Sequence, residues 1–117
     1  VLDTVIGRTH GNIATSTATV GPTTALTDTI SLAFAAFFTP NISSTAGIPS
    51  LTNGYEPIAY FNSEALSDTS CVSGAGIVVG MKVTNSTSGE SCEYNIRASG
   101  GIREEIQAIL AVFKEVV

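Results

Sequence analysis

Ionised side chains are scarce in this sequence. Asp, Glu, Lys and Arg make up 13% of the 117 residues, about half of their share in an ordinary soluble domain. Only five residues are basic, against ten acidic ones, and the net charge is −5. Binding to nucleic acid through a general basic surface needs clustered cations, which this chain does not supply. We therefore expect nucleic acid as a partner only in the form of cargo inside an assembled particle. The basic residues are scattered along the chain at Arg8, Lys82, Arg97, Arg103 and Lys114.

Long apolar runs are also missing, although 44% of the residues are hydrophobic. No run reaches the length that is needed to span a bilayer, so we expect no membrane span. The hydrophobic share is well above that of disordered chains. The length allows one core of ordinary size, which predicts a single folded domain over residues 1–117.

The residue types that carry most enzyme chemistry are few. His10 is the only histidine, and no Gly-x-Ser-x-Gly motif accompanies any serine. One histidine, two distant cysteines and unspaced carboxylates do not form a zinc or calcium ligand set. The sequence thus predicts no catalytic residues, no metal site and no cofactor, and we expect that the protein is not an enzyme.

A glycine-rich run over residues 74–80 has the look of a dinucleotide-binding loop. Its third glycine, Gly80, comes one place late, and the run opens a β-prone segment instead of a helix, so a phosphate would find no helix N-terminus. The pattern favours glycines that allow a strand to bend or pack closely.

Cys71 and Cys92 are the only cysteines, and they are too far apart for a CxxC redox or zinc pair. We predict a disulfide between them, which would close a loop of roughly 20 residues and stabilise the fold by about 3 kcal/mol. Such a bond implies an oxidising compartment or an assembled particle exposed to air. The alternative is two separate thiols that are buried as small hydrophobic groups.

Hydroxyl groups replace the missing charges, since the chain has 15 Thr and 13 Ser, and much of it is β-prone. Two runs, Leu2 to Arg8 and Ile13 to Val20, predict an N-terminal hairpin, and Gly76 to Thr84 with Ser91 to Ala98 predicts a second one. Leu26 to Phe38 fits either a helix or a strand, and its alternation over nine residues favours the strand.

Beyond Gly100 and Gly101 the apolar period changes from two to 3.6, which predicts an amphipathic helix over Ile102 to Val117. The expected fold class is therefore α+β. It consists of a mainly antiparallel β-sheet, with an N-terminal hairpin and further strands, and one C-terminal helix packed on the sheet or on a partner subunit. The helix provides the candidate residues for an oligomer interface, namely Ile102, Ile106, Ile109, Leu110 and Phe113.

A hairpin over Leu2 to Val20, a last strand over Ser91 to Ala98 and the terminal helix resemble in their order the coat proteins of small single-stranded RNA phages. The resemblance is one of architecture, covers the two ends of the chain and involves no sequence motif. It implies an interlocked dimer within a larger shell.

Few charges, many small residues and no catalytic set are typical of a subunit that buries its surface against copies of itself, because charged residues are depleted in interface cores. Our first hypothesis is a self-assembling structural protein, either a viral coat subunit or an extracellular filament subunit, located in the virion or outside the cell. The alternative is a secreted monomeric binding module, such as an inhibitor, toxin or adhesin domain, which is stabilised by one disulfide and binds through the 39–54 loop.

Overall fold

The computed structural model describes residues 1–10, 17–27, 30–42, 50–62, 74–85, 87–95 and 106–115. In this part of the chain the protein is all-β, with eight strands and no helix. Accordingly, none of the residues in these ranges forms a helix that could cross a bilayer. The strands are β1 (Leu2–His10), β2 (Thr17–Val20), β3 (Ser31–Ile42), β4 (Ser50–Leu51), β5 (Glu56–Asn62), β6 (Gly74–Thr84), β7 (Cys92–Asn95) and β8 (Ile106–Lys114).

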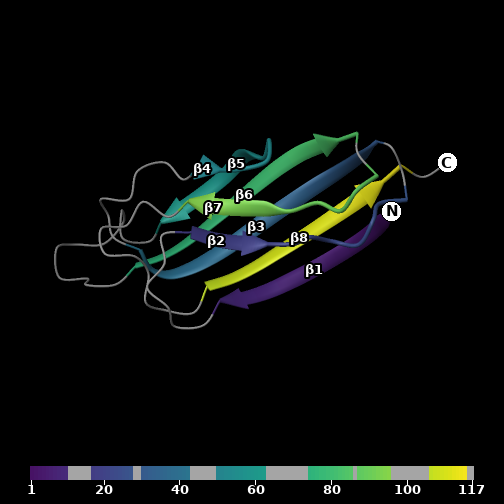
Figure 1. The fold of residues 1–117 in the computed structure, drawn as a ribbon. Coiled ribbons are helices and arrows are strands. Elements are labelled where there is room, and N and C mark those ends of the chain that lie inside the picture. The colour runs from purple at the N-terminus through teal and green to yellow at the C-terminus, as the bar shows by residue number, and fades with distance from the viewer. Residues whose placement is uncertain are drawn as a thin grey trace.

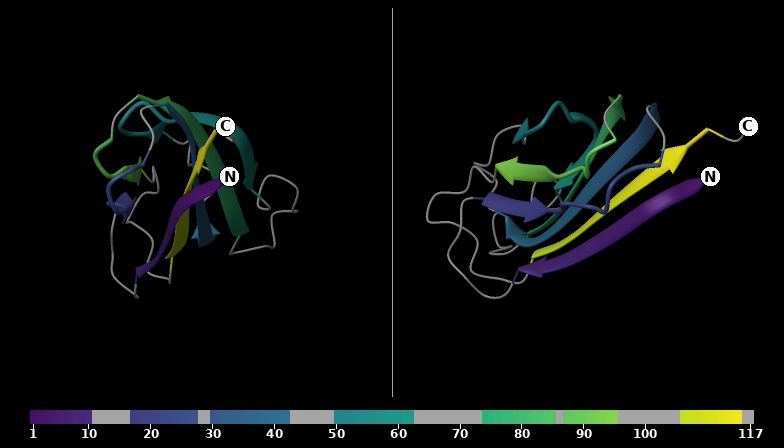
Figure 2. Two further views of the ribbon diagram at one scale, coloured as in Figure 1. Left: turned by 90° about the vertical axis from the view of Figure 1, so that its right-hand side faces the viewer. Right: turned by 45° about the vertical axis from the view of Figure 1, so that its right-hand side comes forward.

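The strands form two antiparallel sheets that lie in two layers (Figure 1, Figure 2). One sheet has five strands in the order β1-β8-β3-β6-β5, and the other has three strands in the order β2-β7-β4. Most connections lead from one sheet to the other, so strands that follow each other in sequence seldom pair. The order is similar to that of a jelly roll, in which two Greek keys are wrapped into a sandwich, except that β5 joins the larger sheet beside β6.

Both hairpins that the sequence predicts are wrong. β1 pairs with β8, and β2 pairs with β7 in the opposite sheet. Likewise β6 pairs with β3 and β5, while β7 lies between β2 and β4. β6 ends at Thr84, as the sequence predicted, but the end of a strand does not determine which strand becomes its neighbour. That choice is made by partners far along the chain, as where Ile6 lies opposite Leu110.

The predicted C-terminal helix, and with it the α+β class, is also wrong, because residues 106–114 form strand β8. Every residue of this strand except Gln107 and Lys114 is apolar, so the sequence satisfies a period of 3.6 and a period of two equally well. Its Ile, Val and Phe residues favour the pleated conformation. Pairing on both sides, to β1 and to β3, then supplies hydrogen bonds to two neighbours.

The preference for a strand in the ambiguous 26–38 segment is confirmed for residues 31–38, which belong to β3. β3 is the central strand of the five-stranded sheet and pairs with β6 and β8. The architectural resemblance to RNA phage coat proteins is not supported, because the hairpin on which it depended is absent and the described part of its helix is β8.

The core lies between the two sheets. From the larger sheet, side chains such as Phe37 and Leu110 point toward the smaller one and are fully buried. The Phe37 ring packs against Tyr94 of β7 at a centroid distance of 5.5 Å. Gly80 of β6 lets Leu51 of β4 approach its backbone so closely that an added Cβ would clash. This is close packing in a strand, as the sequence favoured for the glycine-rich run.

Candidate interaction surface

The five-stranded sheet has two faces, and both are apolar. Its inner face is covered by the smaller sheet, whereas side chains on its outer face point away from that sheet. Burial alternates along each long strand, and cross-strand register places the exposed positions of β8, β3 and β6 on the same side. We call this set the outer face. On the three central strands it consists of Leu32, Phe34, Ala36, Phe38, Ile77, Val79, Met81, Val83, Gln107, Ile109, Ala111 and Phe113.

No member of the set carries a charge, and only Gln107 is polar. The flanking edge strands add Val5, Gly7 and Thr9 from β1 and Glu56 and Ala59 from β5, so one carboxylate lies at the margin. Several large side chains are solvent-exposed in the isolated chain, with Ile109 at 49%, Phe38 at 44% and Ile77 at 43%. An antiparallel sheet with one face in water normally alternates apolar and polar residues. This sheet has the composition of one that is covered on both sides.

The outer face is large enough to hold a partner. Five strands about 4.8 Å apart and seven residues of about 3.4 Å each give a plane of about 24 by 24 Å. A standard protein interface takes about 800 Å² of accessible surface from each partner. A plane of about 600 Å², enlarged by the side chains that project from it, reaches that size. Isolated monomers seldom expose a contiguous apolar patch of this extent.

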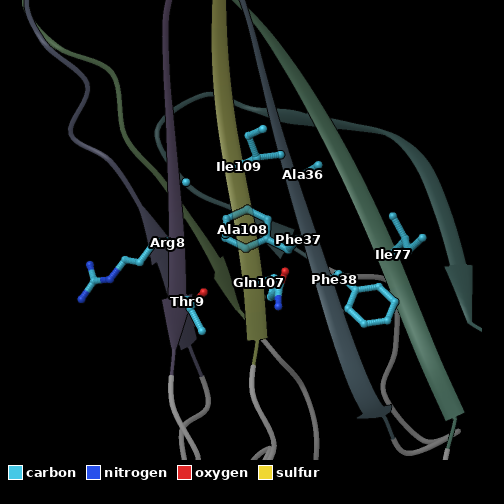
Figure 3. A pocket seen from close by; sticks show the side chains of 10 residues that line it. Arg8, Thr9, Ala36, Phe37, Phe38, Ile77, Gln107, Ala108 and Ile109 are labelled. Atoms are coloured by element: carbon cyan, nitrogen blue, oxygen red, sulfur yellow. The ribbon is translucent and has the colours of Figure 1, made fainter.

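A depression of about 490 Å³ is hollowed into the outer face near one end of β1, β8 and β3. It arises where Gly7 and Ala36, both small, flank Ile109 in one cross-strand row. Phe38 and Ile77 form the rim toward β6, as Figure 3 shows. The Arg8 side chain points away from the depression (Figure 3), so the cation does not contribute charge to its floor.

At the other end of the outer face, Phe113 projects with 39% of its surface exposed. Phe34 on β3 holds it in an edge-to-face contact, with the ring centroids 6.0 Å apart and the planes at 79°. This geometry is favourable for aromatic pairs and restricts the orientation of the Phe113 ring. The face thus combines a hollow at one end with a fixed projection at the other.

The interface candidates from the sequence fall on both faces of the sheet. Ile109 and Phe113 lie on the outer face, whereas Ile106 and Leu110 are fully buried in the core. Ile102 lies outside the described residues. Sequence reasoning missed Phe34, Phe38 and the apolar positions of β6. The missed signal is that β3, β6 and β8 are apolar at odd and even positions alike.

A buried ionic cluster around Glu90 lies on the inner side of the larger sheet. Glu90, 3% exposed, accepts a hydrogen bond from Lys82 Nζ at 3.2 Å and another from the Tyr55 hydroxyl at 3.2 Å. The Lys82 ammonium also lies 5.6 Å from the centroid of the Tyr55 ring. Burial, followed by the nearby Glu90 charge, raises the pKa of the Tyr55 hydroxyl. Glu90 is fixed further by its backbone, which exchanges hydrogen bonds with Thr23. The partners of Glu90 come from strand β6, which contains Lys82, and from the connections before β5 and after β2, which contain Tyr55 and Thr23.

Cys92 is a buried free thiol in the core. Burial raises the pKa of this thiol to about 12, so it is protonated and unreactive at neutral pH. Cys71 lies outside the described residues. The predicted disulfide between the two cysteines is not seen in the described part of the structure and stays a prediction.

His10 ends β1 and connects the two sheets. Its Nε2 atom lies 2.8 Å from the carbonyl oxygen of Thr19 and 3.1 Å from the nitrogen of the same residue in β2. These contacts engage Nε2, one of the two ring nitrogens, with the backbone of β2. The described residues also contain no group of three His, Cys, Asp or Glu side chains that could hold a metal ion.

No protein-family model, no curated protein and no solved structure matches this chain. The class that the fold and the surface define is an all-β two-sheet domain with one large apolar sheet face uncovered in the single chain. Further interpretation depends on the physical chemistry of that face.

Proposed function

We propose that this chain is a non-enzymatic structural subunit that assembles with copies of itself through the outer face. The observation that supports this most is the absence of charge on the outer positions of the three central strands. Interface cores are depleted in charged residues, and apolar surface gains about 25 cal/mol for each Å² removed from water. The outer positions of the three central strands carry no carboxylate that would repel a second copy, and Glu56 lies at the margin of the face.

A second copy fits the outer face better than a nucleic acid or an ionic ligand does. A partner of those kinds would be recognised by charged groups, and the face offers Thr9 and Gln107 as its polar members besides the marginal Glu56. Every copy carries the same apolar surface, so a homo-oligomer covers it without a further component. Any nucleic acid would then be cargo within the assembly.

The proposal extends to the kind of assembly, which is a viral coat or an extracellular filament, located in the virion or outside the cell. Jelly rolls serve in capsid subunits and also in lectins, so the fold is compatible with the proposal and does not decide it. A secreted monomeric binding module would leave the outer face in water, and this difference is measurable.

The test is sedimentation velocity of the full chain over a range of micromolar concentrations. We expect the unmodified protein to associate, and Ile109→Glu to sediment as a monomer, because the new carboxylate would be buried without a partner. Ile109 is half exposed in the single chain, so the fold tolerates this change. The matched control is Thr87→Glu, which places the same charge on an exposed residue of the connection to β7 and should leave association unchanged.

A monomeric unmodified protein would overturn the proposal and favour the binding module. Persistent association of Ile109→Glu would also overturn it, because the contact would then lie elsewhere. Circular dichroism of each variant verifies that the subunits remain folded.

A further inference from the structure

The outer face has a hollow toward one end and a projection toward the other. The depression is lined by the row of Gly7, Ile109 and Ala36 and by the next row toward the strand end, and Phe113 stands four residues from Ile109 along β8 in the other direction. Four residues of a strand span about 13 Å. Between the two rows lies Ala111, a small residue that lets a second sheet approach closely.

We propose that two copies pack outer face against outer face. The two-fold axis lies between the two sheets, runs perpendicular to β8 and passes over Ala111, so that Phe113 of each copy enters the depression of the other. This inference rests on the proposed function and adds the symmetry and the contact that determine it. A two-fold axis at the midpoint exchanges the Phe113 row with the Ile109 row, and the contact is therefore made twice. A self-complementary contact of this kind closes a dimer, which would then be the building unit of the coat or filament.

The geometry tolerates the twist of the sheets. Stacked sheets lie about 10 Å apart, and their strands usually cross at about 30°. Phe113 is about 7 Å from the axis, so this rotation displaces its ring by about 3.5 Å, which is less than the spacing of neighbouring strands. The ring therefore stays over the row of Gly7, Ile109 and Ala36, which lines one side of the depression.

Gly7 allows a test that leaves the subunit intact. A Cβ atom built on Gly7 would lie 3.7 Å from the carbonyl oxygen of Ala108, which is an ordinary contact. Gly7→Val therefore fits the single chain, suits a strand, and fills part of the hollow from within. Phe113→Ala removes the projection and leaves the hollow open. We expect each change alone to weaken association at least tenfold in sedimentation velocity.

The decisive measurement is the double variant. If the ring of one copy enters the hollow of the other, then adding Phe113→Ala to Gly7→Val relieves the clash, and the double variant associates more tightly than Gly7→Val alone. Two changes at unrelated sites would instead add their losses. The control pair is Gly7→Val with Val83→Ala, which trims another exposed apolar residue of the same face and should weaken association further without any rescue.

The outcomes separate the two proposals. If the Ile109→Glu variant is monomeric but Phe113→Ala gives no rescue in the Gly7→Val background, the two-fold contact is overturned while assembly through the outer face stands. If the unmodified chain does not associate, or if Ile109→Glu still associates, the function itself is overturned. Rescue by Phe113→Ala and not by Val83→Ala establishes the contact.

Discussion

The two faces of the five-stranded sheet are made of nearly the same residue types but differ in what covers them. Ile106 and Leu110 on the inner face have no exposed surface, whereas Ile109 and Phe113 on the outer face keep 49% and 39% of theirs. Ions also differ: the inner side holds the Lys82 and Glu90 pair with its hydrogen bonds, and the outer positions of the central strands have no ion at all. Composition therefore does not distinguish the core from the outer face, but burial in the single chain does.

The largest expected effect comes from truncating neighbouring residues that point to opposite faces. Leu110→Ala should lower the free energy of unfolding by about 3 kcal/mol, because it opens a cavity between the sheets. Ile109→Ala should cost less than about 1 kcal/mol in dilute protein, since half of this side chain is already in water. Urea unfolding measures both. The Ile109→Ala loss should grow with protein concentration, because association stabilises the folded subunit. If Leu110→Ala and Ile109→Ala lowered the free energy of unfolding equally at every protein concentration, the two faces would not differ.

A smaller effect is expected when a carboxylate is removed from each side. Glu90→Ala leaves Lys82 and the Tyr55 hydroxyl without their partner, and it should lower the free energy of unfolding by about 2 kcal/mol. Glu56→Ala removes an exposed carboxylate at the margin of the outer face and should change it by less than about 0.5 kcal/mol. Thermal unfolding of both variants under one buffer provides the comparison. If Glu90→Ala were as stable as Glu56→Ala, the cluster around Glu90 would not contribute to the free energy of unfolding.

The smallest effect concerns alkaline pH in the reduced protein. Burial raises the pKa of the Cys92 thiol from 9.0 to about 12 and that of the Tyr94 hydroxyl from 10.0 to about 12. Both groups are neutral in the folded state, so their contribution is complete below pH 9 and declines as the unfolded chain ionises between pH 9 and 12. Urea unfolding at several pH values should show stability falling above pH 9, with a shallower fall in Cys92→Ala.

The same pH change should leave the association constant of the outer-face contact almost unchanged. The described outer-face residues include no thiol, phenol or amine that titrates in this range. A flat stability profile up to pH 10.5, or an association constant that falls in parallel with stability, would contradict this separation of the two faces.

Several elements could be predicted from the sequence because their signals are local. β-prone runs bounded by glycine, proline and asparagine placed β1, β6 and part of β3 close to their observed positions. Gly80 was interpreted as a residue that allows close packing in a strand, and Leu51 lies against its backbone. These inferences depend on the conformations that a few neighbouring residues allow, and tertiary contacts left them unchanged.

The pairing and the C-terminal element could not be predicted in this way. Residues 106–114 are apolar except for Gln107 and Lys114, so their periodicity fits a helix and a strand equally well. Pairing with β1 on one side and β3 on the other determined that they form a strand. The interface candidates were assigned to one helical stripe for the same reason. Once the segment is a strand, alternate residues point in opposite directions, and the stripe is divided between core and surface.

By itself, the sequence determined that this chain has one small core, few ions and mostly β-prone segments, because these properties follow from composition and from local conformational preference. Only the tertiary structure decided which strands became neighbours and which apolar residues remained outside. The reason is that the partner of a strand lies far along the chain, and a sheet has two faces of which the smaller sheet can cover one.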